Sequence, residues 1–208
     1  MFVGKRMTKK LITVAPEDTL ERAAALLAGH RIHRLPVVRE DRLVGIVSDS
    51  DIRNAAVGPS PPGGGSVGGK TVGEIMTREV ITVNPWDTVE DALLILQKKR
   101  LGALPVVDGA RVIGIITKAD VLAALVETLD IEGIGARIEV LLPRDIAAVK
   151  KLVGLISEKG IEVRSIVLAP HRDRFAAFLR LVTIDVPAVK DTLRNAGFTI
   201  AELEDFLG

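Results

Sequence analysis

Residues 35–51 read LPVVREDRLVGIVSDSD, and residues 104–120 read LPVVDGARVIGIITKAD. Both stretches belong to a longer internal repeat, because a shift of 69 positions aligns residues 7–55 with residues 76–124 without a gap. Of these 49 pairs, 21 are identical, whereas unrelated sequences of ordinary composition would share about three. A repeat of this length indicates two copies of one folding unit, which can pack across a pseudo-twofold axis with equivalent clefts side by side.

Each copy begins with the signals of a helix. Asp18-Thr19-Leu20-Glu21 has the capping-box pattern, and Asp87-Thr88-Val89-Glu90 repeats it. The apolar positions that follow at helical spacing are Leu20, Ala23, Ala24 and Leu27 in the first copy and Val89, Ala92, Leu93 and Leu96 in the second. One amphipathic helix is therefore predicted near the start of each copy.

Two short apolar runs follow each predicted helix. They span 35–38 and 43–47 in the first copy and 104–107 and 112–116 in the second. Polar residues separate the runs, which is typical of hairpin turns. A second helix is expected to begin near Ser48 and near Thr117. With a first strand ahead of the first helix, the predicted order in each copy is β-α-β-β-α.

The whole chain has an α+β pattern in four predicted segments. Residues 1–57 and 71–128 hold the two copies, and residues 58–70 join them. The Gly, Pro and Ser content of the joining segment is typical of a flexible linker. Residues 134–208 form a third unit with the order β-α-β-β-α-β, which is the ferredoxin-like plan.

The third unit is predicted from its alternation, turns and caps. Apolar alternation from Ile138 to Leu142 indicates a strand, and a helical pattern that starts at Ile146 ends at Gly160. The later elements are strands over 161–169 and 175–183 joined at 171–174, a helix capped by Asp185 with Pro187 in its first turn, and a last strand over 198–203.

Composition excludes several function classes. The net charge is +1, so the global positive field of nucleic-acid binders is absent. The chain has no cysteine, which rules out disulfides and thiol catalysis and fits a reducing cytosol. No apolar run approaches the roughly 20 residues that cross a bilayer. We therefore expect a cytoplasmic protein that binds neither nucleic acid nor membrane.

No catalytic or metal-binding constellation is predicted. Residues 64–71 match the P-loop pattern G-x-x-x-x-G-K-T, but that motif follows a buried strand and opens a long helix. The preceding residues 58–63 read GPSPPG and cannot form such a strand. We attribute the match to the Gly-rich linker and expect a chain that is not an enzyme and requires no cofactor.

The repeat resembles the CBS domain, a family named for cystathionine β-synthase. Its most diagnostic part is Gly-apolar-apolar-Ser/Thr-x-x-Asp, which stands at residues 45–51 and again at residues 114–120. Two CBS domains usually form a nucleotide-sensing pair called a Bateman module. The resemblance covers about residues 1–125, and it implies AMP, ADP, ATP or S-adenosylmethionine as an effector bound between the repeats.

The resemblance implies a role for each motif position. Asp51 and Asp120 would accept hydrogen bonds from the ribose hydroxyls, and Ser48 and Thr117 would face the phosphates at a helix N-terminus. The residues expected beside the adenine are the strand edges Thr13, Val14, Thr82 and Val83 and the apolar walls Leu35, Pro36, Leu104 and Pro105. Ser/Thr-x-x-Asp is also an ordinary N-capping pattern, so a structural role is the alternative.

The two clefts are expected to differ. Arg34 can donate two hydrogen bonds to a phosphate, whereas its counterpart Ala103 cannot. Lys118 stands in the second motif where the first has Asp49, which would repel a phosphate. We predict unequal affinities, and the choice of cleft stays open because each can borrow cations from the other copy. For Arg34, an exposed surface charge is the alternative.

Residues 134–205 resemble an ACT-type regulatory domain, and two CBS repeats followed by an ACT-like unit resemble the acetoin utilization protein B group. Amino-acid-binding ACT members typically have a glycine in the turn after their first strand, whereas this chain has Pro143-Arg144-Asp145-Ile146. We therefore favour dimerisation over amino-acid sensing. The predicted function is a homodimeric nucleotide sensor that regulates an unidentified protein, and the alternatives are a ligand-free interaction scaffold or an amino-acid sensor.

Overall fold

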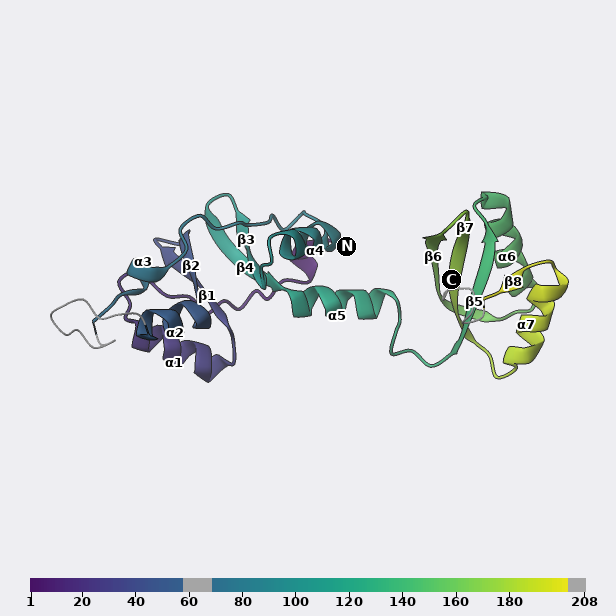
Figure 1. Cartoon of the computed structure of the whole chain (residues 1–208), viewed down its shortest axis with the longest axis horizontal. Coiled ribbons are helices and arrows are strands. Elements are labelled where there is room, and N and C mark those ends of the chain that lie inside the picture. The colour runs from purple at the N-terminus through teal and green to yellow at the C-terminus, as the bar shows by residue number, and fades with distance from the viewer. Residues whose placement is uncertain (58–68, 202–208) are drawn as a thin grey trace. The chain divides into compact units, whose positions relative to one another are not determined.

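The computed structural model describes residues 1–57 and 69–201, and the chain divides into two compact units, Met1–Ala124 and Leu125–Gly208 (Figure 1). The first unit holds both copies of the repeat, and the second holds the predicted β-α-β-β-α-β segment. Most of the predicted linker and most of the P-loop pattern lie outside the described residues.

The helices and hairpin strands predicted for the two copies are confirmed. The first copy contains η1 (Val3–Lys5), α1 (Leu20–His30), β1 (Arg34–Arg39), β2 (Arg42–Ser48) and α2 (Asp49–Val57). The second copy contains α3 (Val72–Ile75), α4 (Val89–Lys98), β3 (Ala103–Asp108), β4 (Arg111–Thr117) and α5 (Lys118–Thr128). The short helices η1 and α3 were not predicted, and α3 begins with a capping box between Thr71 and Glu74.

The first strand predicted in each copy is reduced to a single bridge. Val14 pairs with Val37, and Val83 pairs with Val106, both in parallel orientation. The amide of Val14 donates to the carbonyl of Pro36 at 3.2 Å. The amide of Val38 donates back to the carbonyl of Val14 at 2.8 Å, but Pro36 has no N–H, so the ladder cannot extend towards Ile12, and a full strand was the wrong prediction.

The capping-box prediction was wrong by one residue. Thr19 is the N-cap of α1 and accepts a hydrogen bond from the amide of Arg22 at 3.2 Å. Asp18 instead accepts from the amide of Ala15 at 2.8 Å, which closes the turn before the helix. The second copy repeats this arrangement at α4, with Thr88 as the N-cap and Asp87 in the preceding turn. Short Asp side chains favour such local turns, so the Asp-to-Glu spacing was coincidental.

The two copies build one four-stranded sheet in the order β1-β2-β4-β3. Strands β2 and β4 meet at Arg42 and Arg111, in the middle of the sheet. The hairpin of each copy has a register shift at the same point, between Val37 and Val38 and between Val106 and Val107. The two copies therefore share even this irregularity of their strand pairing.

The start of each copy pairs with the other copy. Thr8 forms an antiparallel bridge with Ile115 of β4, and Thr77 forms one with Ile46 of β2. Because of this exchange, residues that follow Thr8 lie beside the second copy's hairpin. Any cleft at this point therefore has one side from each copy.

The glycine of each motif lies at one of these crossings. A Cβ atom at Gly114 would collide with the side chain of Met7, and one at Gly45 would collide with the side chain of Met76. The first position of the Gly-apolar-apolar-Ser/Thr-x-x-Asp pattern is thus explained by the close approach of the other copy.

The core of each copy lies between its helices and its hairpin. The buried side chains of the first copy include Val14, Leu20, Ala23, Leu27, Leu35, Val37, Val47 and Ile52. Their counterparts in the second copy that are also buried are Val83, Val89, Ala92, Leu96, Leu104, Val106, Ile116 and Val121. The identical pairs of the alignment therefore include many core positions, as the helical and strand periodicities predicted.

The second unit has the predicted β-α-β-β-α-β order. Its elements are β5 (Ala136–Pro143), α6 (Ile146–Glu158), β6 (Glu162–His171), β7 (Arg174–Val182), α7 (Val186–Asn195) and β8 (Thr199–Ile200). The strand order is β6-β7-β5-β8, and both helices pack on one face of the sheet through a core centred on Leu142, Leu152 and Leu193 (Figure 1). The last strand is shorter than predicted, and residues 202–203 lie outside the described part.

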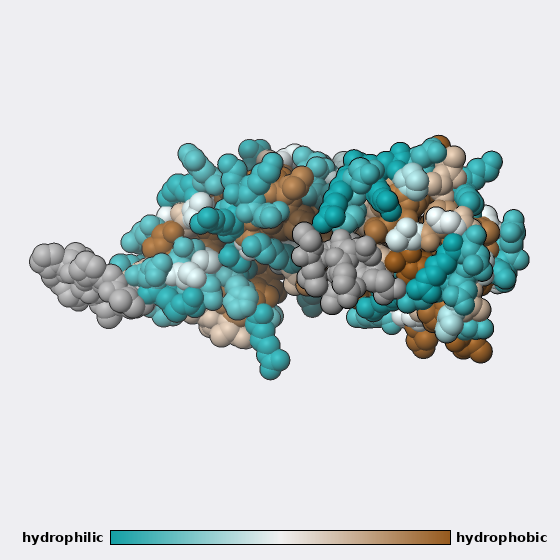
Figure 2. Space-filling model, turned by 45° about the vertical axis from the view of Figure 1, so that its right-hand side comes forward, coloured by the Kyte–Doolittle hydropathy of each residue, from teal (hydrophilic) through white to brown (hydrophobic). Residues whose placement is uncertain are grey.

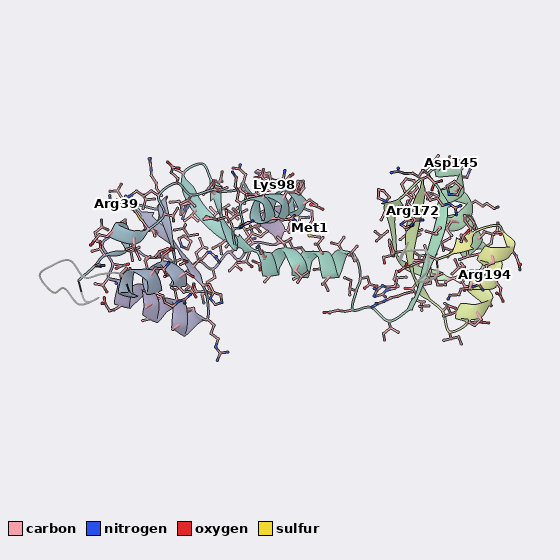
Figure 3. The ribbon with its side chains drawn as sticks, in the orientation of Figure 1. Met1, Arg39, Lys98, Asp145, Arg172 and Arg194 are labelled. Carbon is pink, nitrogen blue, oxygen red and sulfur yellow. The ribbon has the colours of Figure 1, made fainter. Side chains whose placement is uncertain are left out.

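The caps of the second unit explain where its helices begin. Asp145 precedes α6 (Figure 3) and accepts a hydrogen bond from the amide of Ala147 at 3.0 Å. Asp185 accepts from the amide of Ala188 at 3.0 Å, with a proline in the first turn of α7. Gly160 follows α6 with a φ of +64°, a conformation that favours glycine. The roles of Asp185 and Gly160 were predicted and are confirmed, whereas the cap at Asp145 was not predicted.

The surface is mostly hydrophilic on the face in Figure 2, with apolar areas between the charged side chains. Within residues 1–57 and 69–201, no helix is both long and apolar enough to cross a membrane.

Candidate functional site

The Ser/Thr-x-x-Asp motif forms the same structure at the start of α2 and of α5. The carboxylate Oδ2 of Asp51 accepts hydrogen bonds from the amide and hydroxyl of Ser48 at 2.8 and 2.6 Å. Asp120 accepts the equivalent bonds from Thr117 at 2.8 and 2.7 Å. The hydroxyl of each Ser or Thr in turn accepts from the amide of the Asp at 3.2 Å. Both motifs are therefore helix caps.

The capping role leaves part of each carboxylate available. Both hydrogen bonds to Asp51 end on Oδ2, and so do both bonds to Asp120. Over the described stretches of the chain, Oδ1 of either residue accepts no hydrogen bond. An aspartate that is fixed in position by one oxygen can offer the other to a hydroxyl donor.

A cleft of about 340 Å³ lies between the two copies, and we call it the open cleft. The first copy lines it with Thr8, Lys10, Leu11, Ile12, Arg31, Ile32, His33, Arg34 and Pro36. The second copy lines it with Ala103, Ile115, Thr117 and Ala119. Its size is at the lower end of the range for small-molecule sites, about 300–1,000 Å³.

The lining combines an apolar wall with a basic rim. Ile12, Ile32 and Pro36 supply apolar surface from the first copy. Lys10 and Arg31 supply positive charge at the same side, and both are exposed. Such a site offers apolar surface to a ring and cations to an anion.

The structure separates the predicted site residues into groups. Four of the predicted site residues line the open cleft: Arg34, Pro36, Ala103 and Thr117. Lys118 and Asp120 flank the lining residue Ala119 along the first turn of α5. The side chains of Val14, Leu35, Val83 and Leu104 are buried in the core. Ser48 and Asp51 belong to the motif of the first copy, at residues 45–51, which does not line the open cleft. The open cleft is also not lined by Thr13, Thr82 or Pro105.

Sequence reasoning missed much of the wall. Lys10, Leu11 and Ile12 lie just before the predicted strand edge, and Arg31 and Ile32 lie just before the predicted Leu-Pro wall. Of the predicted strand-edge residues, Val14 and Val83 have side chains buried in the core, whereas Thr13 is exposed without lining the cleft. The missed signal was a basic residue directly before an apolar stretch at two places, Lys10 before Leu11 and Ile12, and Arg31 at the end of α1 before Ile32.

Arg34 reaches across to the second copy. A Cβ atom at Gly102 would collide with the guanidinium of Arg34. Gly102 is the counterpart of His33, which lines the open cleft. Ala103 is the counterpart of Arg34 and is too short to reach across in the same way. The two equivalent places in the pair are therefore unlike, because one has the guanidinium of Arg34 beside Gly102 and the other has Ala103 and His33.

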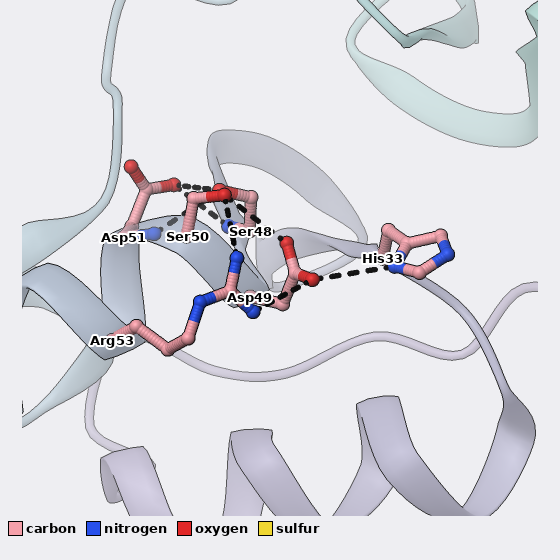
Figure 4. Close-up of polar contacts among 6 residues, drawn as sticks. All are labelled: His33, Ser48, Asp49, Ser50, Asp51 and Arg53. Carbon is pink, nitrogen blue, oxygen red and sulfur yellow. Dashed lines mark hydrogen bonds and ion pairs between the residues drawn. The ribbon is translucent and has the colours of Figure 1, made fainter.

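A charge cluster distinguishes the first copy (Figure 4). Oδ2 of Asp49 lies 3.0 Å from Nη1 of Arg53 and 3.3 Å from Nδ1 of His33. The hydrogen bond from Arg53, with a smaller contribution from His33, lowers the pKa of Asp49 from 3.8 to about 2. The counterparts in the second copy are Lys118, Leu122 and Gly102, which cannot form this cluster.

The cluster predicts how stability depends on pH. Because the pKa of Asp49 is lower in the folded state, its contribution is fully present above about pH 4 and is lost as the pH falls towards 2. Carboxyl carbon shifts measured by NMR should show Asp49 titrating near 2. In Arg53→Gln the midpoint should move up towards 3.8, and in His33→Asn it should move less. A midpoint of 3.8 in the unsubstituted protein would contradict the cluster.

Two copies of one α/β unit, with a Ser/Thr-x-x-Asp cap at the last helix of each, define a tandem-repeat module with a ligand-sized cleft between its copies. The family model described as CBS domain matches residues 3–58 and 72–127, which together are more than half of the chain. The chain belongs to the CBS domain family.

Curated relatives match the same part of the chain. The CBS domain-containing protein YhcV of Bacillus subtilis is 32% identical over 120 residues, which cover 57% of this chain and 81% of YhcV. Inosine-5'-monophosphate dehydrogenase of Thermoplasma acidophilum is 35% identical over 115 residues, or 55% of this chain. The match spans only 21% of that larger enzyme, so it implies no catalytic function here.

Solved structures resemble the first unit. The CBS domain pair of protein MJ0100, in complex with 5'-methylthioadenosine and S-adenosyl-L-methionine, has a TM-score of 0.54 and 32% identity over 62% of this chain and 98% of that one. CBSX2 of Arabidopsis thaliana in complex with AMP has a TM-score of 0.52 and 30% identity over 61% and 97%. The acetoin utilization protein AcuB of Vibrio cholerae has a TM-score of 0.56 and 28% identity over 64% and 95%.

Proposed function

We propose that the chain is a regulatory module that binds an adenine nucleotide or S-adenosylmethionine in the open cleft. The observation that carries this proposal is the composition of the cleft, in which an apolar and basic wall from the first copy faces Thr117 and Ala119 at the start of α5. Related CBS pairs bind AMP, or S-adenosyl-L-methionine with 5'-methylthioadenosine, which supports this class of ligand.

Each part of such a ligand has a matching group. The ribose hydroxyls donate to the available Oδ1 of Asp120, which the cap at Thr117 holds in place. The adenine packs on the apolar surface of Ile12, Ile32 and Pro36. The phosphates lie towards the amides at the N-terminus of α5, where the helix dipole favours an anion.

Charge favours the open cleft over its counterpart. Lys10 lines the open cleft, whereas the residue at the same repeat position in the second copy is Glu79. The motif beside the open cleft contains Lys118, whereas the other motif contains Asp49. A phosphate therefore meets two additional lysines at the open cleft. At the counterpart it meets Glu79 and Asp49, and their repulsion is reduced in part because Asp49 is paired with Arg53 and the guanidinium of Arg34 lies beside Gly102. We infer that the open cleft binds nucleotide more tightly.

The regulatory role would be exerted on a partner protein, and the chain itself would carry out no reaction.

We propose that the chain is a homodimer and that its second unit is an ACT-type domain that contributes to the dimer. The exposed Leu94 on α4 and Leu122 on α5, 49% and 62% exposed, support an association surface on the second copy. Light scattering should give twice the chain mass of 22.3 kDa, and a monomer mass would exclude the dimer.

Calorimetry with AMP, ADP, ATP and S-adenosylmethionine tests the binding proposal. At least one of the four should bind with saturable heat. In Ala119→Trp the tighter site should be lost, because an exposed lining residue becomes large enough to fill the cleft. The matched control is Ser50→Trp, the same position of the first copy, which should keep the tighter site.

The absence of heat with all four compounds would favour the alternative of an interaction scaffold without ligand. Equal loss of binding in Ala119→Trp and Ser50→Trp would contradict the assignment to the open cleft.

A further inference from the structure

The sheet of the second unit has one face that α6 and α7 do not cover. The core beneath these helices takes alternate residues of β5, β6 and β7, so the intervening residues stand on the opposite face. The strand register aligns Ser165 of β6, Arg180 of β7 and Arg137 of β5 in one row across that face. This row is independent of the open cleft and of the nucleotide proposed there.

Arg180 is the one polar or charged residue classed as buried among the described residues, with 8% of its surface exposed. Its Nη1 donates to the carbonyl of Ile131 at 2.7 Å and to that of Gly133 at 3.4 Å. These bonds hold the segment that precedes β5 against the sheet. They use only one of the three nitrogens of the guanidinium.

The remaining edge of the Arg180 guanidinium has no protein partner in the described ranges. Its Nε and Nη2 donate no hydrogen bond there, and no carboxylate of the described residues lies within ion-pair distance, although the charges of Arg180 and Asp130 attract each other from further away. The nearby Asp130 is bound by Arg164, whose Nε lies 2.8 Å from Oδ2, and this bond is the largest cause of the lowered pKa of Asp130. An anion that meets this edge would gain charge-assisted hydrogen bonds from Nε and Nη2 that no described side chain supplies.

A pocket of about 360 Å³ opens at this place. Arg180, Arg137 and Ser165 line it on the polar side, and Val167 and Phe178 line it on the apolar side. The Nε–Nη2 edge of a guanidinium matches the two oxygens of a carboxylate. Glu139 also lines the pocket, and its charge repels a doubly charged anion such as phosphate more strongly than a singly charged carboxylate.

We propose that this pocket of the second unit binds a small carboxylate with a short apolar tail. The carboxylate pairs with the Nε–Nη2 edge of Arg180, and the tail lies against Val167 and Phe178. Arg137 adds a second positive charge at the rim, because its own Nη2 is bound only weakly, at 3.3 Å from the carbonyl of Ile131.

NMR titration of the full chain with isovalerate tests the proposal. The amide signals of Ser165, Phe178 and Gly133 should shift and saturate. Isovaleramide has the same shape without the charge and should cause no saturable shift, and neither should inorganic phosphate. No saturation with isovalerate, or equal shifts with the amide or with phosphate, would overturn the proposal.

Two variants separate binding from a purely structural role of Arg180. Arg180→Met should raise the dissociation constant for isovalerate at least about tenfold, since charged hydrogen bonds are lost. That change also removes the bonds to the preceding segment, so it can lower the melting temperature. Val167→Phe fills the pocket and leaves those bonds in place, and it should abolish binding at an unchanged melting temperature. Unchanged binding in Val167→Phe would show that the pocket is not the site.

Discussion

Asp120→Asn is expected to weaken nucleotide binding at the open cleft by about tenfold to a hundredfold, because a hydrogen bond to a charged group contributes about 1.5–3 kcal/mol. Asn keeps an oxygen that can accept from the amide and hydroxyl of Thr117, so the helix start is retained. The substitution removes the negative charge that strengthens the bonds to the ribose hydroxyls. Calorimetric dissociation constants for the tighter site measure the effect.

Asp51→Asn is the matched control for this prediction. Asp51 caps α2 through the same bonds, at 2.8 and 2.6 Å, as Asp120 makes at α5. Both variants should therefore lose similar stability, and only Asp120→Asn should weaken the tighter site. If Asp51→Asn had the larger effect on that site, the assignment of the two clefts would be reversed.

Leu35→Ala is expected to lower the free energy of unfolding by about 2–5 kcal/mol, as other fully buried Leu-to-Ala changes do. The side chain of Leu35 has no exposed surface and packs in the core of the first copy with Leu20 and Val37. The sequence interpretation placed it on the wall against the adenine. Urea unfolding followed by circular dichroism measures the loss.

Leu94→Ala supplies the comparison for Leu35→Ala. Leu94 is 49% exposed on α4, and its truncation should cost less than about 1 kcal/mol. Leu104→Ala, at the counterpart of Leu35, should cost about as much as Leu35→Ala because it is equally buried. A small stability loss in Leu35→Ala together with a large loss of nucleotide affinity would show that Leu35 contacts the ligand instead of packing in the core.

The repeat made most of the first unit predictable. A gapless match of 49 residues preserved the periodicity of helices and strands in both copies, so the elements and the core followed from it. The exchange of the copies' first residues was not predictable, since an isolated bridge such as that between Thr8 and Ile115 leaves no periodic signal. That exchange is what brings Lys10, Leu11 and Ile12 to the cleft.

The Ser/Thr-x-x-Asp motif shows which features a residue pattern can predict and which it cannot. Ser/Thr-x-x-Asp was consistent with a cap or with a ligand site, and the structure shows the cap at both Asp51 and Asp120. It also leaves one carboxylate oxygen of each without a described protein donor. Which wall each motif faces depends on how the copies pack, and the sequence of one copy contains no information about that.

In the second unit, the caps and turns were predictable from short-range chemistry. Asp185 and Gly160 act within a few residues of their own position, so the sequence indicates them directly. The burial of Arg180 was not predictable. It depends on the segment at Ile131 and Gly133, which folds over β7 from 49 and 47 residues away.

A crystal structure of the chain with bound ATP tests most directly whether both copies contribute to one nucleotide site. The adenine should lie against Ile12 and Pro36 of the first copy while both ribose hydroxyls donate to Asp120 of the second. A nucleotide held by Asp51, or one that contacts a single copy only, would contradict the composite cleft.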